Sequence, residues 1–314
     1  MKRFLKSFAL FMIPIIAFAV IVESILRFSP NDYNYKSNYM SEHASEIECL
    51  ILGNSHSAWG IAPNYFPFKT FNLAFAGQPL IFDELLLEKY INKMTSLKYV
   101  ILSTSYCVPY YDFEHDENDV STRIYPIYFD IYPDYDEWKY HFEITASHPR
   151  IILSRLANML SSTELRCLEY GNYTEQCLSD TIQLSNLAAL KHNDFYRRVC
   201  DSLPVIYEKN VGALKKMVNL CEEKAIHLFL VIPPHTVSYL NNLNPQMKNE
   251  TLSLLQDISQ SSNVCVLNYS NDIRFLDNRN FSDEDHLCQQ GSEKFSKILN
   301  DTIQKFCARL IVVQ

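Results

Sequence analysis

The sequence predicts an α/β protein in which a three-layer, doubly wound parallel sheet follows one N-terminal transmembrane helix. Two observations predict this fold class. A basic and then apolar segment opens the chain, and from residue 46 onward short apolar runs of strand length alternate with longer segments of helical periodicity. With 314 residues, the chain can form one large α/β domain that carries insertions.

Composition excludes several classes of protein. Charged residues make up 20% of the chain and hydrophobic residues 47%, which fits neither a disordered chain nor a polytopic membrane protein. The net charge is -8, and Lys and Arg do not cluster after residue 6, so no nucleic-acid partner is expected. No cysteine and histidine spacing is typical of zinc, and neither a metal nor a cofactor is expected.

Residues 1–30 are predicted to form an uncleaved signal anchor. Lys2, Arg3 and Lys6 precede an apolar run over 7–22, and a spanning helix of about 20 residues fits if Glu23 lies at the far interface. Basic residues before the span predict a cytoplasmic N-terminus and an extracytoplasmic remainder. The protein is therefore expected in the cell membrane as a single-pass protein.

Two alternatives exist for this N-terminal segment. A cleaved signal peptide is one, because residues 17–19 read Ala-Phe-Ala, but the apolar run continues directly past this pattern. A buried core helix is the other, and it is weaker because the basic and then apolar order stands at the very start of the chain. We therefore favour the anchor.

The elements after the anchor are expected in a fixed order. Residues 31–45 are polar and are predicted to form a linker, and residues 46–314 form the α/β domain. Apolar runs predict strands at 47–52, 70–74, 99–103, 227–232 and 264–268, and helical periodicity covers 80–94, 205–225 and 245–259. Ser292 can cap a last helix. Ligands of such sheets bind beyond the carboxyl ends of the strands.

An insertion at about 107–204 interrupts this alternation. Its first part is rich in aromatic and acidic residues, and its second part, from about 149 to 200, reads as helical. We interpret it as an inserted subdomain or lid. Its aromatic residues are best explained as the small core of the insertion, and the alternative is a surface on which sugar rings stack.

The nine cysteines leave at least one thiol unpaired. Cys167 and Cys177 bracket a polar stretch, and a disulfide that closes this loop would suit an exported chain. The spacing leaves the connectivity open.

Residues suited to nucleophilic catalysis follow the strands. Ser55 comes directly after the first predicted strand, Gly77 follows the second, and Asp283 and His286 precede the last helix. A serine hydroxyl needs a base to take its proton, and the histidine base needs a carboxylate that orients it. The backbone N–H groups of Ser55 and Gly77 could stabilise an oxyanion.

These residues resemble the motifs of the SGNH or GDSL hydrolases. The Gly-Asp-Ser block of that family is matched by Gly53-Asn54-Ser55, its second-block glycine by Gly77, and its Asp-x-x-His block by Asp283 and His286. The resemblance covers residues 46–310 in block order, and the insertion has no counterpart. It implies a flavodoxin-like sheet with Ser55 as nucleophile, His286 as base and Asp283 as its orienting partner.

The chain departs from the family pattern at two places. Asn54 replaces the usual Asp, and the third block, Gly-x-Asn-Asp, is missing, since the turn after the third strand reads Ser-Thr-Ser-Tyr at 103–106. The missing Asn is an oxyanion donor in the family, so Ser105, Thr104 or another loop would have to replace it. The third block is also missing in a membrane-anchored branch of the family. This chain resembles that branch, in particular the D-alanyl transfer protein of teichoic acids and the alginate O-acetylation proteins.

Three further residues are candidates for the site. His56 follows the nucleophile and His235 follows the fourth strand, so both are possible substrate contacts. A turn histidine bonded to backbone is an equally good explanation for His56, and two prolines that end a strand explain the neighbourhood of His235. Asp285 competes with Asp283 as the partner of His286, and the spacing favours Asp283.

The leading functional hypothesis is a membrane-anchored, extracytoplasmic serine esterase or O-acyltransferase. It would act on acyl esters, in particular acetyl esters, of a cell-envelope or extracellular polysaccharide. By family analogy alone, a transferase would work with a polytopic membrane acyltransferase. The alternatives are a catalytically inactive SGNH-like envelope-assembly or glycan-binding protein and, with less support from the acidic insertion, a lipase.

Overall fold

The structure is a computed structural model that describes residues 1–112, 125–132, 138–146, 149–159, 166–179 and 184–313. The chain divides into two compact units. One combines residues 1–38 with 113–166, and the other combines 39–112 with 167–314. The sheet lies in the second unit.

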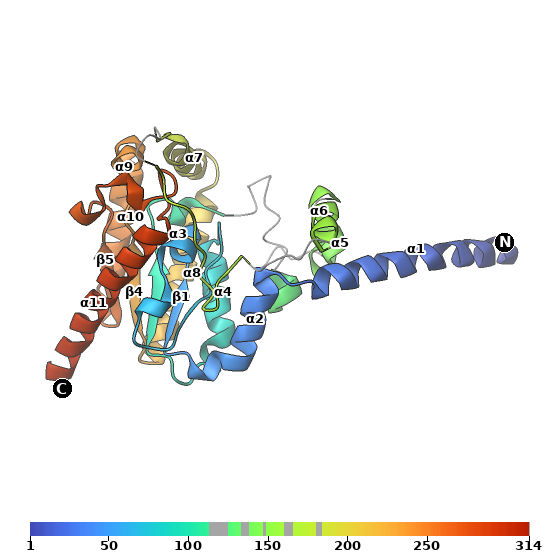
Figure 1. Ribbon diagram of the computed structural model, residues 1–314, viewed down its shortest axis with the longest axis horizontal. Coiled ribbons are helices and arrows are strands. Elements are labelled where there is room, and N and C mark those ends of the chain that lie inside the picture. The colour runs from blue at the N-terminus through green and yellow to red at the C-terminus, as the bar shows by residue number, and fades with distance from the viewer. Residues whose placement is uncertain (113–124, 133–137, 147–148, 160–165, 180–183, 314) are drawn as a thin grey trace. The chain divides into compact units, whose positions relative to one another are not determined.

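Five parallel strands form one sheet in the order β2-β1-β3-β4-β5 (Figure 1). Leu50 pairs with Phe71 on one side and with Val100 on the other. The strands are β1 (Cys49–Leu52), β2 (Thr70–Asn72), β3 (Tyr99–Ser103), β4 (His227–Ile232) and β5 (Val264–Asn268). The chain places β2 on one side of β1 and then β3, β4 and β5 on the other side, so the order switches between β1 and β3. The carboxyl ends of these two strands form the crevice where such folds bind ligands.

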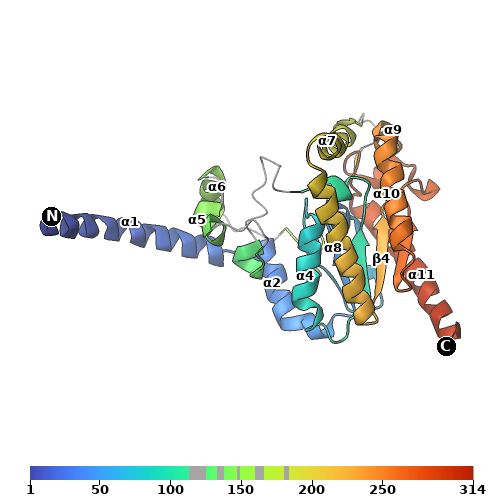
Figure 2. The ribbon, with the colours of Figure 1, turned by 180° about the vertical axis from the view of Figure 1, so that it is seen from behind.

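Helices cover both faces of this sheet and confirm the predicted three-layer α/β class. Seen from behind, α4, α8 and α10 lie in front of the strands, whereas α11 covers the opposite face (Figures 1 and 2). The helices of the second unit are α3 (Ser55–Gly60), α4 (Leu80–Ile91), α7 (Leu187–Asp201), α8 (Pro204–Glu223), α9 (Val237–Asn242), α10 (Pro245–Ile258) and α11 (Gln289–Val313). Its short 3-10 turns are η1 (Ala44–Glu46), η2 (Pro63–Tyr65), η3 (Val108–Tyr110), η7 (Ile273–Phe275) and η8 (Asn278–Asn280).

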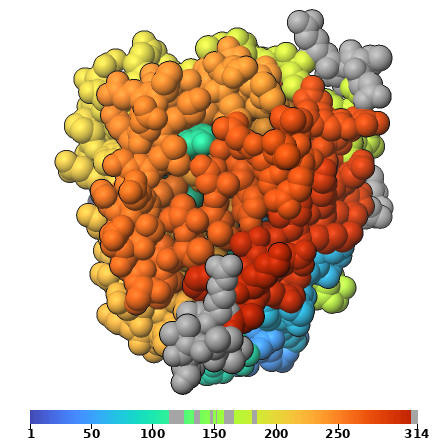
Figure 3. Space-filling view, turned by 90° about the vertical axis from the view of Figure 1, so that its left-hand side faces the viewer, coloured from blue at the N-terminus to red at the C-terminus, as the bar shows by residue number. Residues whose placement is uncertain are grey.

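Apolar residues at helical spacing on α11 form the core between this helix and the sheet. Phe295, Leu299 and Ile303 are completely buried and pack with Ile51 and Phe229 of the sheet. Full burial of each such side chain contributes about 1.5–3 kcal/mol. The C-terminal third of the chain, in orange and red, forms much of the surface on this side of the domain (Figure 3).

The first unit contains a helix, α1 (Lys2–Phe28), that is long and apolar enough to cross a membrane by length and composition, and it is the only such helix in the described part of the chain. Near its end, the Glu23 carboxylate accepts hydrogen bonds from the backbone N–H groups of Glu143 and Ile144. Arg155 pairs with Glu143 at 2.7 Å and donates to the Leu26 carbonyl. These hydrogen bonds connect parts of the insertion to the C-terminal end of α1.

The remaining elements belong wholly or partly to this first unit. They are α2 (Asp32–His43), the π-helical turn η5 (Tyr125–Phe129), the 3-10 turn η6 (Trp138–His141), α5 (Glu143–Ala146) and α6 (Pro149–Met159). The polar segment 31–45 that was expected to be a linker is therefore mostly helical, as α2.

The insertion predicted at about 107–204 is split between the two units. Residues 113–166 group with the N-terminal residues, whereas 167–204 group with the sheet. Tyr125 and Phe129 are buried and their tilted rings lie 5.9 Å apart between centroids, as a small core would require, while Trp138 is largely exposed. Residues 113–124, 133–137, 147–148, 160–165 and 180–183 of the insertion lie outside the described residues.

The disulfide differs from the pairing considered for the sequence. Cys177 bonds to Cys288, which lies far along the chain, and Cys167 is buried and is not part of this disulfide. A local loop closure was therefore wrong. The polar stretch that contains Cys177 instead runs beside residues 281–288, where the N–H of Leu178 donates to the Phe281 carbonyl.

Candidate active site

The turn after β1 presents Ser55 at the start of a helix. Gly53 has a φ of 118°, a conformation that favours glycine, and a Cβ there would lie 2.5 Å from the Ser103 hydroxyl oxygen. The Gly53 N–H donates to the Asp83 carboxyl of α4 at 2.7 Å. Asn54 then caps α3 by accepting from the His56 N–H at 3.0 Å. The chain thus changes sharply from strand to helix, and Ser55 is the first residue of that helix.

Ser55, His286 and Asp283 form a continuous chain of hydrogen bonds. The Ser55 Oγ lies 2.8 Å from His286 Nε2, and His286 Nδ1 lies 2.9 Å from Asp283 Oδ2. This geometry fits a neutral histidine that carries its proton on Nδ1 and accepts the serine proton on Nε2. The structure therefore brings together the three residues that the sequence suggested as a triad.

Local bonds hold the loop that carries Asp283 and His286. One oxygen of Asp283 accepts from the backbone N–H groups of Asp285 and His286, each at 2.7 Å. The Ser282 N–H donates to the His286 carbonyl at 2.9 Å, and Cys288 is fixed by the disulfide. These contacts fix the histidine ring before any substrate binds.

The electrostatics of the loop favour a charged imidazolium. Burial alone would lower the pKa of His286, but the hydrogen bond to Asp283 and the charges of Asp285, Asp283 and Glu284 outweigh it and raise the pKa to about 8. Burial alone would raise the pKa of the Asp283 carboxyl, and the contacts with His286 and the backbone N–H groups lower it instead. The pair thus stabilises the charge that His286 acquires when it takes a proton.

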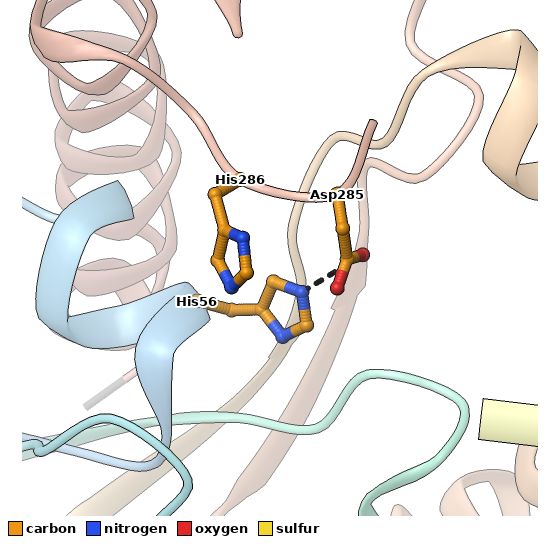
Figure 4. Close-up of side chains that lie close together, drawn as sticks. All are labelled: His56, Asp285 and His286. Carbon is orange, nitrogen blue, oxygen red and sulfur yellow. Dashed lines mark ion pairs between the residues drawn. The ribbon is translucent and has the colours of Figure 1, made fainter. Parts of the chain in front are cut away.

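Asp285 lies in a second, fully buried cluster. One of its carboxylate oxygens is 3.0 Å from His56 Nε2 and 3.1 Å from His235 Nδ1. The other ring nitrogen of His56 is 2.9 Å from the Ser105 hydroxyl. Figure 4 shows the Asp285 carboxylate facing the ring of His56, which stacks against His286 at 5.2 Å between centroids.

The Asp285 carboxyl of this second cluster is ionised at neutral pH. Burial alone would raise the pKa of Asp285, but its contacts with His56 and His235 hold the pKa well below the ordinary value. Burial lowers the pKa of His192 to about 4 and also lowers that of His235, and the charge of Asp285 only partly opposes this. His192 and His235 are therefore neutral where the carboxylate is charged.

The backbone N–H groups of Ser55 and Gly77 are available as donors. Within the described part of the chain neither N–H has an acceptor, and both residues line the same cavity. Gly77 has a φ of 66°, which glycine adopts at no steric cost. Ser105 is completely buried, contacts His56 and does not line this cavity, and the Thr104 N–H donates to the Val231 carbonyl.

The cavity beside Ser55 has a volume of about 510 Å³. Its walls combine aromatic, cationic and acidic side chains with the residues of the loop. It is lined by Asn54, Ser55, His56, Trp59, Ala76, Gly77, Cys107, Tyr111, Glu175, Ala188, Lys191, His192, Phe195, Ser282, Asp283, Asp285 and His286. A cavity of this size holds a small acyl group together with part of a larger alcohol.

Some of the residues that line the cavity were predicted from the sequence, and others were not. His56 lines the cavity as suggested, whereas His235 is buried behind it and contacts Asp285. His192 and Phe195 were missed because they belong to α7 in the insertion, which no motif connects to the strand ends. Their helical spacing indicated an amphipathic helix and nothing about what its apolar face covers.

Three donor atoms, one each from His56, Asp285 and His286, lie within 4.8 Å of one another, a spacing that a metal ion could bridge. Both ring nitrogens of His286 are already bonded, one to Ser55 and one to Asp283. A metal ion on His286 would have to break one of these contacts. The hydrogen bonds therefore fit a triad better than a metal centre.

Known proteins resemble this chain in structure. No family model matches the chain, and no curated protein matches it. Among solved structures, a GDSL-like lipase from Bacteroides thetaiotaomicron VPI-5482 aligns with 87% of this chain and 98% of its own, at 13% identity and a TM-score of 0.40. A likeness at this level carries no argument about activity, which has to come from the geometry of the site.

Proposed function

We propose that this protein is a serine esterase or O-acyltransferase of the SGNH type. The observation that carries the proposal is the chain of hydrogen bonds from Ser55 through His286 to Asp283. These residues line the same cavity as Gly77, and in the described part of the chain the N–H groups of Ser55 and Gly77 have no acceptor. These are the parts that acyl transfer needs, namely a nucleophile, an oriented base and donors for an oxyanion.

The first half of the reaction forms an acyl-enzyme. His286 Nε2 takes the hydroxyl proton as Ser55 Oγ bonds to the ester carbonyl carbon, and the carbonyl electrons move to the oxygen. The N–H groups of Ser55 and Gly77 stabilise this oxyanion. When the intermediate collapses, the ester C–O bond breaks and His286 returns its proton to the leaving alkoxide.

The second half transfers the acyl group to an acceptor. His286 takes a proton from water or from a sugar hydroxyl as its oxygen attacks the acyl carbon and the carbonyl electrons move to the carbonyl oxygen again. When this second intermediate collapses, the bond between the acyl carbon and Ser55 Oγ breaks and His286 returns the proton to Ser55 Oγ. Water as the acceptor gives hydrolysis, and a sugar hydroxyl gives transfer. How well the cavity excludes water decides between the two outcomes.

The proposed substrate is an acyl ester, in particular an acetyl ester, of a cell-envelope or extracellular polysaccharide. Trp59, Tyr111 and Phe195 line the cavity, and aromatic faces of this kind stack against sugar rings. With α1 as an uncleaved anchor, the site would lie outside the membrane, near such polymers. If the enzyme is a transferase, a polytopic membrane acyltransferase that delivers the acyl group is the expected partner.

A second candidate function is that of a non-catalytic glycan-binding or envelope-assembly protein. The turn after β3, where the SGNH pattern has an asparagine donor, favours it, because Ser105 in that turn is turned toward His56. The hydrogen-bonded triad speaks against it. A catalytic test separates the two candidates.

That test measures ester hydrolysis by the full chain in detergent. We expect release of p-nitrophenol from p-nitrophenyl acetate, and release of acetate from an acetylated polysaccharide. Ser55→Ala should lower kcat/KM at least about a thousandfold, because the nucleophile is lost. Ser253→Ala, at an exposed position on α10, should leave it unchanged. Equal rates for Ser55→Ala and the unaltered protein would exclude the proposed mechanism.

A further inference from the structure

This inference rests on the proposed acyl transfer and concerns how the oxyanion is stabilised. The tetrahedral intermediate places a full negative charge on one oxygen, and enzymes of this mechanism meet it with preorganised donors. Ser55 and Gly77 supply two backbone N–H groups. Among the described residues, none of those at 103–106 in the turn after β3 lines the cavity, and there the Ser105 hydroxyl contacts His56 and the Thr104 N–H is bonded to Val231.

The side chain of Asn54 is held in one orientation. Its oxygen, Oδ1, accepts from the His56 N–H at 3.0 Å and from the Ser103 hydroxyl at 3.3 Å. A backbone N–H can donate only to the oxygen of a carboxamide, so the positions of the oxygen and the nitrogen are fixed by chemistry. The absence of a side chain at Gly53 leaves the space that the Ser103 hydroxyl occupies.

The amide nitrogen of Asn54 is left with two N–H donors. In the described part of the chain neither of them has an acceptor. The nitrogen atom is nevertheless not completely buried. Asn54 lines the cavity next to Ser55, Gly77 and His286. The two donors therefore belong to a nitrogen that is not completely buried, on a residue that lines the same cavity as the nucleophile.

We propose that the carboxamide of Asn54 is the third donor of the oxyanion hole. Its oxygen caps α3 and is bonded to Ser103, and its nitrogen donates to the oxyanion that forms when Ser55 attacks. Because the oxygen is held at two points, the nitrogen needs no reorganisation during the reaction. One residue thus performs two functions through the two ends of one amide.

The same geometry explains why an aspartate would not serve at this position. A carboxylate would cap the helix equally well, and its charge would suit the helix N-terminus. A carboxylate, however, carries no N–H, so it could not replace the donor that is missing after β3. Asn54 in place of an acidic residue and the missing asparagine after β3 are therefore two parts of one arrangement.

The test compares Asn54→Asp with the unaltered protein. The substitution preserves shape and capping, removes the two N–H donors and adds a negative charge. We expect kcat for p-nitrophenyl acetate to fall roughly a hundredfold to a thousandfold with KM little changed, because the interaction exists only in the transition state. The rate at which a fluorophosphonate labels Ser55 should fall in parallel, and the melting temperature should be unchanged or higher.

Two further variants complete the test. Asn54→Ser keeps a capping oxygen without adding a charge and should also lose activity. Asn244→Asp is the matched control, because Asn244 caps α10 through its side-chain oxygen outside the cavity, and it should keep full activity. A purely structural role of Asn54 predicts that Asn54→Asp is as active as Asn244→Asp, and that result would overturn the inference.

The failure of this inference can be told apart from the failure of the proposed function. If the unaltered protein is labelled at Ser55 and Asn54→Asp is labelled at the same rate, only the role of Asn54 is wrong. If Ser55 is not labelled in the unaltered protein, the proposed acyl transfer is wrong, and the role of Asn54 is wrong with it.

Discussion

Two carboxylates on one loop have different surroundings. Asp283 has a side chain 47% exposed and bonds to the His286 ring, whereas Asp285 is buried and contacts His56 and His235. The pairing of Asp283 with His286 could be predicted, because residues three apart on a short turn meet locally. The partners of Asp285 come from distant parts of the chain, and only the folded sheet brings them to it.

The raised pKa of His286 predicts the pH dependence of activity. The base works only when it is neutral, so kcat/KM should rise with pH, reach half its maximum near pH 8 and then level off. Asp285→Asn removes a negative charge that helps to raise this pKa, so its half-maximum should lie about one pH unit lower.

The measurement is a pH–rate profile of p-nitrophenyl ester hydrolysis from pH 5.5 to 9.5. Asp257→Asn, at an exposed position of α10, is the control and should keep the profile of the unaltered protein. Identical midpoints for Asp285→Asn and Asp257→Asn would contradict this account of His286.

At the scale of elements, the turn between β1 and α3 depends on a buried acid of α4. Asp83 accepts hydrogen bonds from the Gly53 N–H and from the Gln78 side chain. Burial raises the pKa of Asp83 to about 8, and these two bonds only partly oppose it. Asp83 is thus mostly protonated at neutral pH and holds the nucleophile turn as an uncharged group.

This raised pKa predicts a pH-dependent stability. A group whose pKa is higher in the folded than in the unfolded protein contributes stability that is fully present below the unfolded pKa and is lost as the pH rises through the folded pKa. The stability that Asp83 contributes is therefore fully present below about pH 4 and is lost as the pH rises to about 8. The free energy of unfolding should therefore fall by about 1 kcal/mol between pH 7 and pH 9 from this group.

Urea unfolding of Asp83→Asn measures that contribution. An amide oxygen can accept the same bonds and does not ionise, so this variant should lose less stability between pH 7 and pH 9 than the unaltered protein. His286 contributes a loss of the same sign in both proteins, and the difference between them isolates Asp83. Parallel curves would show that Asp83 does not titrate in this range.

The elements themselves differ in how well the sequence predicts them. The ranges 99–103, 227–232 and 264–268 match β3, β4 and β5, because buried parallel strands are continuous apolar runs bounded by polar turns. The helix over 32–43 was not predicted, since its sequence has little apolar periodicity. The Cys177–Cys288 bond was also missed, because pairing depends on which loops meet in space.

At the scale of the whole molecule, a doubly wound parallel sheet follows from the alternation of strands and helices, whereas the division into units does not. Contacts of Glu23 and Arg155 join the insertion to α1, and charged residues in different elements carry no signal of such pairing. The apolar segment at the start of the chain, in contrast, is readable from composition and is the helix α1.

We predict that α1 is an uncleaved anchor and that the catalytic unit lies outside the cytoplasm. The full chain should stay with the membrane fraction after washing at high pH, and a C-terminal alkaline phosphatase fusion should be active, because that enzyme needs an oxidising compartment. A soluble protein that lacks its first residues would indicate a cleaved signal peptide. An inactive fusion would indicate the opposite orientation.

The central claim is that Ser55 is the nucleophile of an acyl-transfer site, and mapping a covalent adduct tests it most directly. The full chain is treated with a fluorophosphonate and digested, and the modified peptide is identified by mass spectrometry. The account predicts a single adduct on Ser55 that disappears in His286→Ala, because the serine then has no base. An adduct on another residue, or none on the folded protein, would contradict it.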